Sequence, residues 1–258
     1  NSYVFQNSLQ TTRGCPFACS FCAVTSFFGR TYRSRPLDEV LSEVDGLAGR
    51  RFLFFVDDNI AAHSGRAKQL FRALIPFKTS WIGQASVTIA NDEELLTLAA
   101  ASGCLALFLG IESLSPASLA SVDKKCNVAA EYEEVIRRIH AHNIAVFAGF
   151  IFGMDHDTED VFESTVRFAQ RTKIEGAQFN VLTPFPGTPL FAAMEKEGRI
   201  LTRDWSEYHA DKVVFAPRLL SAQRLQEGRD WAWREFYSLR SIWQRIGVSH
   251  PRGLLAWA

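Results

Sequence analysis

Short apolar segments alternate with amphipathic segments through most of this 258-residue chain, and this rhythm restricts the fold more than any other feature. Six segments have the length and the apolar, β-branched and aromatic content of strands buried on both faces: 8–12, 52–56, 81–85, 105–111, 145–152 and 177–182. Strand and helix in alternation require parallel strands with right-handed crossovers, in an open doubly wound sheet or a barrel. A complete eight-unit barrel takes roughly 250 residues. We therefore predict an α/β fold in which residues 1–200 form a partial (β/α)6 barrel of the TIM type.

Start and stop signals mark the helices between these strands. Pro36 opens one helix, Val40, Val44 and Leu47 give it an apolar stripe, and Gly49 closes it. Further helices are predicted from about residue 91, over 129–141 and from about residue 157.

The rhythm ends near residue 200. Residues 201–258 contain five of the six tryptophans and many arginines, and 219–246 have the pattern of one or two helices. We predict a helical carboxyl-terminal extension, 201–258, that covers an open side of the barrel.

Composition and charge exclude several classes of protein. With 47% hydrophobic and 22% charged residues the chain can bury a core, which excludes disorder. The 28 basic residues balance 28 acidic ones, which argues against a general nucleic-acid binder. No apolar segment is long enough to cross a bilayer, and residues 1–10 lack the pattern of a signal peptide. The first residue is Asn rather than Met, so we expect a piece of a longer protein.

The loop after the first strand holds the strongest chemical signal in the chain. Cys15, Cys19 and Cys22 lie within eight residues as C-x-x-x-C-x-x-C. This spacing suits a metal or a cluster rather than extracellular disulfides, so we expect reduced thiols and a cytoplasmic location. Three thiolates on one loop can hold three corners of a cubane and leave the fourth iron open to a ligand. Gly14 and Pro16 help the chain to wrap around such a cluster.

A structural zinc site is the alternative for these cysteines. Closed zinc sites usually take two short pairs of ligands from separate segments. Cys104 lies within a strand-like segment and Cys126 stands alone, so neither supplies a second pair. A non-catalytic iron–sulfur or zinc protein, used for electron transfer or scaffolding, stays as an alternative function.

The segment GCPFACSFC, placed after the first strand of a βα-repeat chain, resembles the radical S-adenosylmethionine (SAM) superfamily over about residues 5–200. The resemblance implies that Cys15, Cys19 and Cys22 ligate a four-iron, four-sulfur (4Fe-4S) cluster, whose open iron binds the amino and carboxylate groups of S-adenosylmethionine. One electron, from a reductase or a flavodoxin-type donor, cleaves the sulfonium and gives a 5′-deoxyadenosyl radical that abstracts hydrogen from a small-molecule substrate. Phe21 would lie beside the adenine. The protein's task is then to position the reactive carbon, because the cofactor supplies the difficult chemistry.

Polar residues follow the second strand at the rim where barrels carry their chemistry. Asp57 and Asp58 stand where the superfamily often has a Gly-Gly-Glu motif that binds the methionine amino group, in a form associated with its cobalamin-dependent branch. The resemblance implies that both carboxylates contact the cofactor. The alternative is a helix N-cap cluster that includes Asn59.

Two later strands end in similar signals. Glu112 follows a nearly apolar strand, and the resemblance implies a polar contact from it to the ribose or the methionine end of the cofactor. Residues 149–153 resemble a Gly-x-Ile-x-Gly motif whose backbone lies along the adenine, which makes Ile151 a cofactor contact. Asp157 follows this motif and is expected to cap a helix. No catalytic residue is assigned beyond these contacts.

The segments GRTYRSRPLDEV, FVDDN, FLGIES, FIFGMD and TPFPGTPLF together resemble radical SAM enzymes with an amino-terminal cobalamin-binding domain. This branch methylates unactivated carbon or phosphorus, or rearranges and cyclises its substrates. The Asp-x-His-x-x-Gly motif that ligates cobalamin is absent from the sequence, so we expect a cobalamin-binding domain upstream of residue 1. The alternative is a methylthiotransferase-like enzyme acting on transfer RNA. Its small basic β-rich RNA-binding domain does not match the helical tail and neutral charge, so nucleic acid is not an expected partner.

Overall fold

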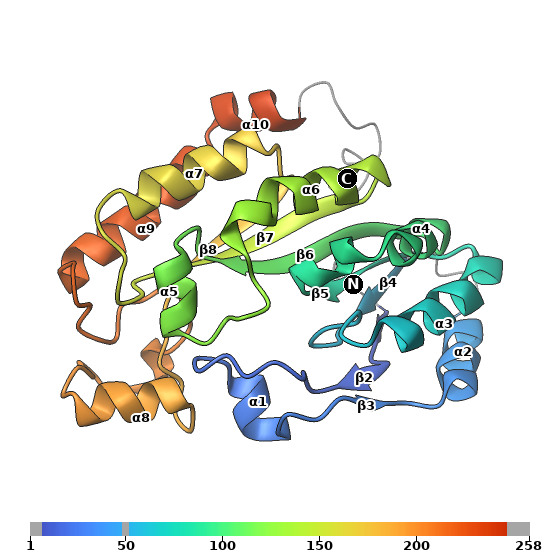
Figure 1. Ribbon diagram of the computed structural model, residues 1–258, viewed down its shortest axis with the longest axis horizontal. Helices are drawn as coiled ribbons and strands as arrows, with labels where there is room; N and C mark the ends of the chain where they lie inside the picture. Colours follow the sequence, from blue (N-terminus) through green and yellow to red (C-terminus); the bar gives the residue numbers. More distant parts are fainter. Residues whose placement is uncertain (1–6, 48–51, 247–258) are drawn as a thin grey trace.

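A computed structural model describes residues 7–47 and 52–246. Within these residues the central element is a six-stranded parallel sheet (Figure 1). The strands stand in the order β1-β4-β5-β6-β7-β8, so neighbours in this sheet also follow one another along the chain. Each predicted strand contributes one member: β1 (Ser8–Leu9), β4 (Phe52–Phe55), β5 (Ser80–Ala85), β6 (Cys104–Glu112), β7 (Ala145–Phe152) and β8 (Gly176–Val181). Every pairing between them is parallel, which confirms the α/β partial barrel.

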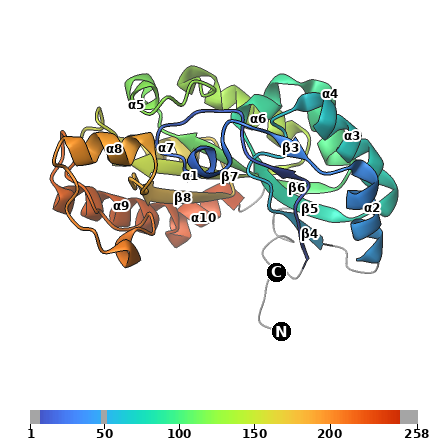
Figure 2. The same cartoon turned by 90° about the horizontal axis from the view of Figure 1, so that it is seen from below.

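Helices connect the strands, and α6 and α7 cover the face of the sheet opposite to α1 (Figures 1 and 2). The helices of the described residues are α1 (Ala23–Phe28), α2 (Leu37–Gly46), α3 (Ser64–Leu74), α4 (Glu93–Ala101), α5 (Pro116–Ser121), α6 (Tyr132–Ala141), α7 (Val161–Arg171), α8 (Pro189–Lys196), α9 (Ala222–Phe236) and α10 (Leu239–Ile246). None of these described helices combines the length and the apolar character that a membrane crossing requires.

The first residues of α2 and α4 follow the predicted start signals. Helix α2 begins directly after Pro36 and buries Val40 and Val44, as the apolar stripe predicts. Its expected end, Gly49, lies outside the described residues. Helix α4 begins after Asp92, whose side chain accepts a hydrogen bond of 3.1 Å from the backbone N–H of Leu95. This N-cap satisfies a donor that the first helical turn leaves without an intrahelical partner.

The first predicted strand is wrong at its carboxyl end, because the segment 8–12 leaves the sheet after Leu9. Next along the chain, β2 (Thr12–Arg13) pairs antiparallel with β3 (Arg33–Ser34) instead. The cause is Asp57, whose buried carboxylate accepts hydrogen bonds from the backbone N–H and hydroxyl of Thr11 and from the hydroxyl of Thr12. These bonds direct the chain away from the sheet and into the cysteine loop, which leads to α1 (Figure 2).

Helix α9 lies along β8, the last strand of the sheet, and bonds to its backbone. Trp233 Nε1 and Arg229 Nε donate to the carbonyl oxygen of Phe179 at 2.9 and 3.0 Å. The hydroxyl of Tyr237 donates to the carbonyl oxygen of Ala177 at 2.8 Å and accepts from its N–H at 3.1 Å. Side chains therefore satisfy groups that an edge strand would otherwise expose. The prediction of one or two helices over 219–246 is confirmed by α9 and α10.

Candidate active site

A cavity of about 280 Å³ lies at the carboxyl ends of the strands. Cys15, Cys19 and Cys22 all line it, and β5 to β8 each contribute wall residues. Parallel barrels carry their chemistry at this end of the strands. The other lining residues come from the cysteine loop, α1, the strand ends and one later loop: Phe17, Phe21, Val24, Thr25, Asp58, Asn59, Gln84, Ala85, Ser86, Phe108, Gly110, Glu112, Lys124, Gly149, Gln178 and Asn180.

The cysteine loop takes its shape from Gly14 and from two backbone contacts. Gly14 has a φ of 86°, in the left-handed region. A Cβ added there would lie 2.2 Å from the carbonyl oxygen of Thr31, so only glycine fits. Farther along the loop, the N–H of Ser20 donates to the carbonyl oxygen of Val122 at 3.0 Å, and the N–H of Leu190 donates to that of Ser20 at 3.0 Å. The loop is therefore fixed between α1, α5 and α8.

Asp57 and Asp58 have different surroundings despite being adjacent. Asp57 is fully buried, does not line the cavity and is engaged by Thr11 and Thr12. Burial raises the pKa of Asp57, and the hydrogen bonds from the two threonines oppose this rise. Asp58 lines the cavity, and its Oδ2 accepts a hydrogen bond of 2.9 Å from the N–H of Gly14. The structure therefore places Asp58 with the cysteines and Asp57 behind the cavity wall.

The other residues predicted to contact the cofactor also fall into two groups, those that line the cavity and those that do not. Phe21 and Glu112 line the cavity with the cysteines. Ile151 does not, although its strand neighbour Gly149 does. Residues two apart in a strand share a face, so Ile151 points to the same side of β7 as Gly149 but lies nearer the carboxyl end. It packs, partly buried, against the apolar core.

Two of the residues that line the cavity, Lys124 and Glu112, form an ion pair. Lys124 Nζ lies 2.8 Å from Glu112 Oε1, and the two side chains are 14% and 10% exposed. Burial alone would lower the pKa of Lys124, but the carboxylate of Glu112 and the nearby Cys19 hold it above its ordinary value. Lys124 therefore presents a charged ammonium group beside the cysteine loop.

Sequence reasoning missed several polar residues of the cavity. Gln178 and Asn180 alternate with apolar residues in β8, and Gln84 interrupts the apolar pattern of β5. Period-two alternation places such residues on one face of a strand, so this signal was present in the sequence. Lys124 had no such signal, because it lies in a loop whose path depends on contacts with β6 and the cysteine loop.

Asp157 has a different role from the expected helix cap. Its Oδ2 accepts hydrogen bonds from the N–H groups of Gly153 and Met154 at 2.9 and 3.0 Å, and its Oδ1 accepts one from the hydroxyl of Ser118 at 2.7 Å. The N-cap of α7 is Asp160 instead. The expectation was wrong because the chain makes an extra turn after β7, which Asp157 closes and ties to α5.

The chemistry of the three cysteines suits an iron–sulfur cluster. Burial raises the pKa of Cys19 to about 12 and also raises that of Cys15. A metal that binds these thiols displaces their protons. In residues 7–47 and 52–246, no group of three or more His, Cys, Asp or Glu side chains is arranged to hold one metal ion. Three cysteines on the wall of one cavity can ligate three irons of a cubane and leave the fourth iron open. Cys104 is buried within β6, away from this cavity.

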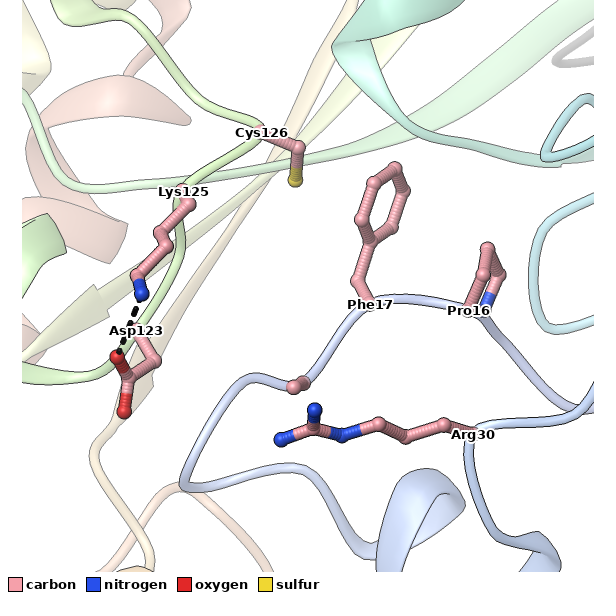
Figure 3. Close-up of a pocket in the computed structure, with 7 residues that line it drawn as sticks. Pro16, Phe17, Arg30, Asp123, Lys125 and Cys126 are labelled. Atoms are coloured by element: carbon pink, nitrogen blue, oxygen red, sulfur yellow. Dashed lines mark ion pairs between the residues drawn. The ribbon is translucent and has the colours of Figure 1, made fainter.

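A second cavity, of about 300 Å³, is lined by residues of the cysteine loop and of the segment 123–126 (Figure 3). Phe17 lines both cavities. Arg30 and Cys126 face this second cavity, and Lys125 lies 3.7 Å from Asp123 in an exposed ion pair. The side chains of Lys124 and Lys125, adjacent in sequence, therefore have opposite environments.

The fold and the cavity define a class of protein, a partial α/β barrel with a three-cysteine cofactor site at its strand ends. The Radical SAM superfamily profile matches residues 9–169. The chain belongs to this superfamily, whose enzymes use a 4Fe-4S cluster and S-adenosylmethionine.

Several curated and solved proteins are similar to the chain. Bacteriochlorophyllide d C-12(1)-methyltransferase from Chlorobaculum tepidum is 35% identical over 240 residues, which cover 91% of this chain and 52% of that protein. Hopanoid C-2 methylase from Rhodopseudomonas palustris is 30% identical over 216 residues, 80% of this chain and 41% of that protein. The structure of the radical S-adenosylmethionine methyltransferase TsrM from Kitasatospora setae, with cobalamin and a [4Fe-4S] cluster bound, aligns with a TM-score of 0.68 and 22% identity over 91% of this chain and 47% of that one. The chain thus spans about half the length of these proteins.

Proposed function

We propose that this chain is the cofactor-binding barrel of a cobalamin-dependent radical SAM enzyme that methylates or rearranges a small molecule. The observation that carries the proposal is the cavity itself, in which three cysteines from one loop meet polar side chains from the strand ends. In this proposal residues 1–200 form the barrel and 201–258 form the helical extension, of which α9 and Tyr237 bond to β8.

Five of the lining residues have a proposed task toward the cofactors. Cys15, Cys19 and Cys22 hold the 4Fe-4S cluster, and their position on the cavity wall supports this assignment. Phe21 and Asp58 contact S-adenosylmethionine. When bound, the cluster and S-adenosylmethionine supply a one-electron cleavage that yields a carbon radical.

Other residues act on the shape of the site rather than on the cofactor. Asp57 holds Thr11 and Thr12, and thereby the start of the cysteine loop, through its buried carboxylate. Gly149 leaves room for the ring of Phe108, which also lines the cavity, because a Cβ at position 149 would lie 3.1 Å from Phe108 Cζ. Ile151 closes the same face nearer the rim. Together these residues exclude water and orient the reacting groups, which is what a protein contributes to cofactor chemistry.

Cobalamin would be held by a part of the protein outside this chain. The similar proteins support cobalamin-dependent methyl transfer, since TsrM is a methyltransferase solved with cobalamin and two relatives are named as a methyltransferase and a methylase. An external one-electron donor, of the reductase or flavodoxin type, and a cytoplasmic location complete the proposal. The alternative of a β-rich RNA-binding tail finds no support in residues 201–246, where the described elements are helical apart from one isolated β-bridge.

The proposal is tested by replacing one cluster ligand in the full-length protein, reconstituted with iron and sulfide without oxygen. We expect Cys19→Ala to lose the cluster and, with reductant and S-adenosylmethionine, to form neither 5′-deoxyadenosine nor S-adenosylhomocysteine above background. Iron content, the visible spectrum and chromatography of the products measure these outcomes. Cobalamin content of the purified holoenzyme tests the proposed branch separately.

Cys104→Ala is the matched control, because Cys104 is equally buried but lies outside the cavity. This variant should keep its cluster and its products. A wild-type protein that binds one zinc ion instead of iron and sulfide would overturn the proposal.

A further inference from the structure

The Lys124–Glu112 ion pair lies directly against Gly110, in space that a side chain at position 110 would fill. A Cβ added at Gly110 would lie 2.3 Å from Glu112 Oε1 and 3.2 Å from Lys124 Nζ, so any larger residue there would displace the pair. Glu112 has a φ of 65°, in the left-handed region, at the point where the register between β6 and β7 shifts. A non-glycine residue in this region is strained, and strain of this kind is concentrated at functional sites.

The loop that carries Lys124 is anchored at both ends. The side chain of Asn127 donates to the carbonyl oxygens of Gly110 and Ile111, each at 2.9 Å. On the other side, the N–H of Ser20 in the cysteine loop donates to the carbonyl oxygen of Val122 at 3.0 Å. Lys124 therefore sits on a short bridge between the end of β6 and the cysteine loop.

Stability alone does not explain this arrangement. Removing two charges from water costs more than a buried ion pair usually returns, so apolar residues of similar volume would serve as well or better. Both side chains line the cavity that the three cysteines share, and the hydrogen bond from Ser20 to Val122 joins the Lys124 loop to the cysteine loop. The ammonium of Lys124 is therefore part of the wall of the cavity proposed to hold the cluster.

We propose that Lys124 sets the reduction potential of the cluster, with Glu112 as the residue that orients its ammonium group. The proposal rests on the proposed function. One electron from an external donor lowers the net charge of the cluster by one unit, and a fixed cation in a site of low dielectric stabilises the more negative form. Lys124 therefore makes the cluster easier to reduce, and Glu112 partly offsets this effect.

The test is the midpoint potential of the reconstituted full-length protein, measured by an anaerobic dithionite titration followed by electron paramagnetic resonance, without S-adenosylmethionine. We expect Lys124→Met to shift the potential to more negative values, because it removes the cation and leaves the carboxylate. Glu112→Gln should shift it to more positive values. Lys124→Arg should restore most of the wild-type potential, because it keeps the charge.

Lys125→Met is the matched control, since Lys125 is 86% exposed, pairs with Asp123 (Figure 3) and does not line the first cavity. Its potential should equal that of the wild type. If Lys124→Met does not fold or load iron, the double variant Lys124→Met/Glu112→Gln leaves no unpaired charge at these two positions, and its potential is compared with that of Glu112→Gln alone. It should be the more negative of the two.

Equal potentials in Lys124→Met and wild type, at equal iron and sulfide content, would overturn this inference while leaving the proposed function intact. The same holds if the double variant and Glu112→Gln have equal potentials. A wild-type protein that forms no cluster would instead contradict the proposed function, and the two failures are therefore distinguishable.

Discussion

Gly14 and Gly29 flank the segment that contains the cysteines, and both have a positive φ, of 86° and 74°. They differ in their surroundings. A Cβ at position 14 would meet the carbonyl oxygen of Thr31 at 2.2 Å, whereas a Cβ at position 29 would meet nothing within 4 Å. Alanine substitutions at these two glycines therefore distinguish the effect of backbone strain from the effect of a steric collision.

We expect Gly14→Ala to lower the iron content of the reconstituted protein several-fold, because the collision forces the loop away from Asp58 and out of its shape. Gly29→Ala carries only the backbone strain of a positive φ with an extended ψ of 177°, about 1–3 kcal/mol, and should keep most of its iron. Iron analysis and thermal unfolding of both variants measure the difference. Equal losses in the two variants would show that the contact with Thr31 does not matter.

At this scale the sequence predicts types of residue better than their tasks. Asp57 and Asp58 carry the same side chain in the same motif, yet one is buried behind the cavity and the other lines it. Alternation along an extended segment separates their directions, but the extent of the preceding strand decides which of them is buried. That extent depends on Thr11 and Thr12, which lie more than forty residues earlier in the chain. The residue pattern around Asp57 and Asp58 therefore cannot predict the contact of Asp57 with Thr11 and Thr12.

Among the secondary-structure elements, α4 shows how a single cap ties together two helices. Asp92 accepts hydrogen bonds from the N–H of Leu95 at 3.1 Å and from the hydroxyl of Ser64 at 2.7 Å, and pairs with Lys68 at 2.8 Å. The hydrogen bonds from Lys68 and Ser64 lower the pKa of Asp92 from 3.8 to about 2. The cap thus joins α4 to α3.

We expect Asp92→Ala to lower the free energy of unfolding by about 1 kcal/mol at neutral pH, the usual cost of an N-cap. Asp92→Asn keeps the cap but loses the charge. An acid whose folded pKa lies below its unfolded value stabilises the fold above the unfolded pKa, and this contribution is lost as the pH falls through the folded pKa. The wild type should therefore lose stability relative to Asp92→Asn between pH 3.8 and about 2.

Urea unfolding of the three proteins over a descending pH series measures both effects. A constant difference between the wild type and Asp92→Asn across this series would refute the pH dependence. A neutral effect of Asp92→Ala at pH 7 would refute the cap.

The elements themselves were largely predictable because buried parallel strands have a strong signal. All six predicted strands belong to the main sheet, and the predicted bounds 145–152 agree with β7 at both ends. Such strands are apolar along their whole length because both faces are covered. The antiparallel pair β2–β3 was missed because each strand has only two residues, too short for any periodicity.

At the scale of the whole molecule, the carboxyl-terminal helices contact the barrel through the close packing of α9 on α7. A Cβ added at Gly228 in α9 would lie 2.3 Å from ring atoms of Phe162 in α7. That ring is buried and packs edge-on against Phe152 with a centroid distance of 5.0 Å, so it has little room to move. Glycine at this position sets the separation of the two helices.

We expect Gly228→Ala to destabilise the protein by about 1–3 kcal/mol, the usual cost of overpacking, and to loosen α9 from the barrel. Gly46→Ala in α2 is the control, because a Cβ there meets nothing within 4 Å. It should be neutral or stabilising, since alanine favours helix more than glycine does. Thermal unfolding and limited proteolysis of the carboxyl-terminal part measure the two effects, and equal stability of both variants would contradict this packing.

The bonds from Trp233, Arg229 and Tyr237 to β8 have a consequence for how this protein meets others. A sheet that ends in free backbone groups can recruit a foreign strand and grow into larger aggregates. Along β8 the carbonyl oxygens of Ala177 and Phe179 already accept hydrogen bonds from indole, guanidinium and phenol groups. A foreign strand could pair with β8 at these positions only after α9 had dissociated from it. Another protein therefore contacts a helical surface there rather than the free backbone groups of a strand.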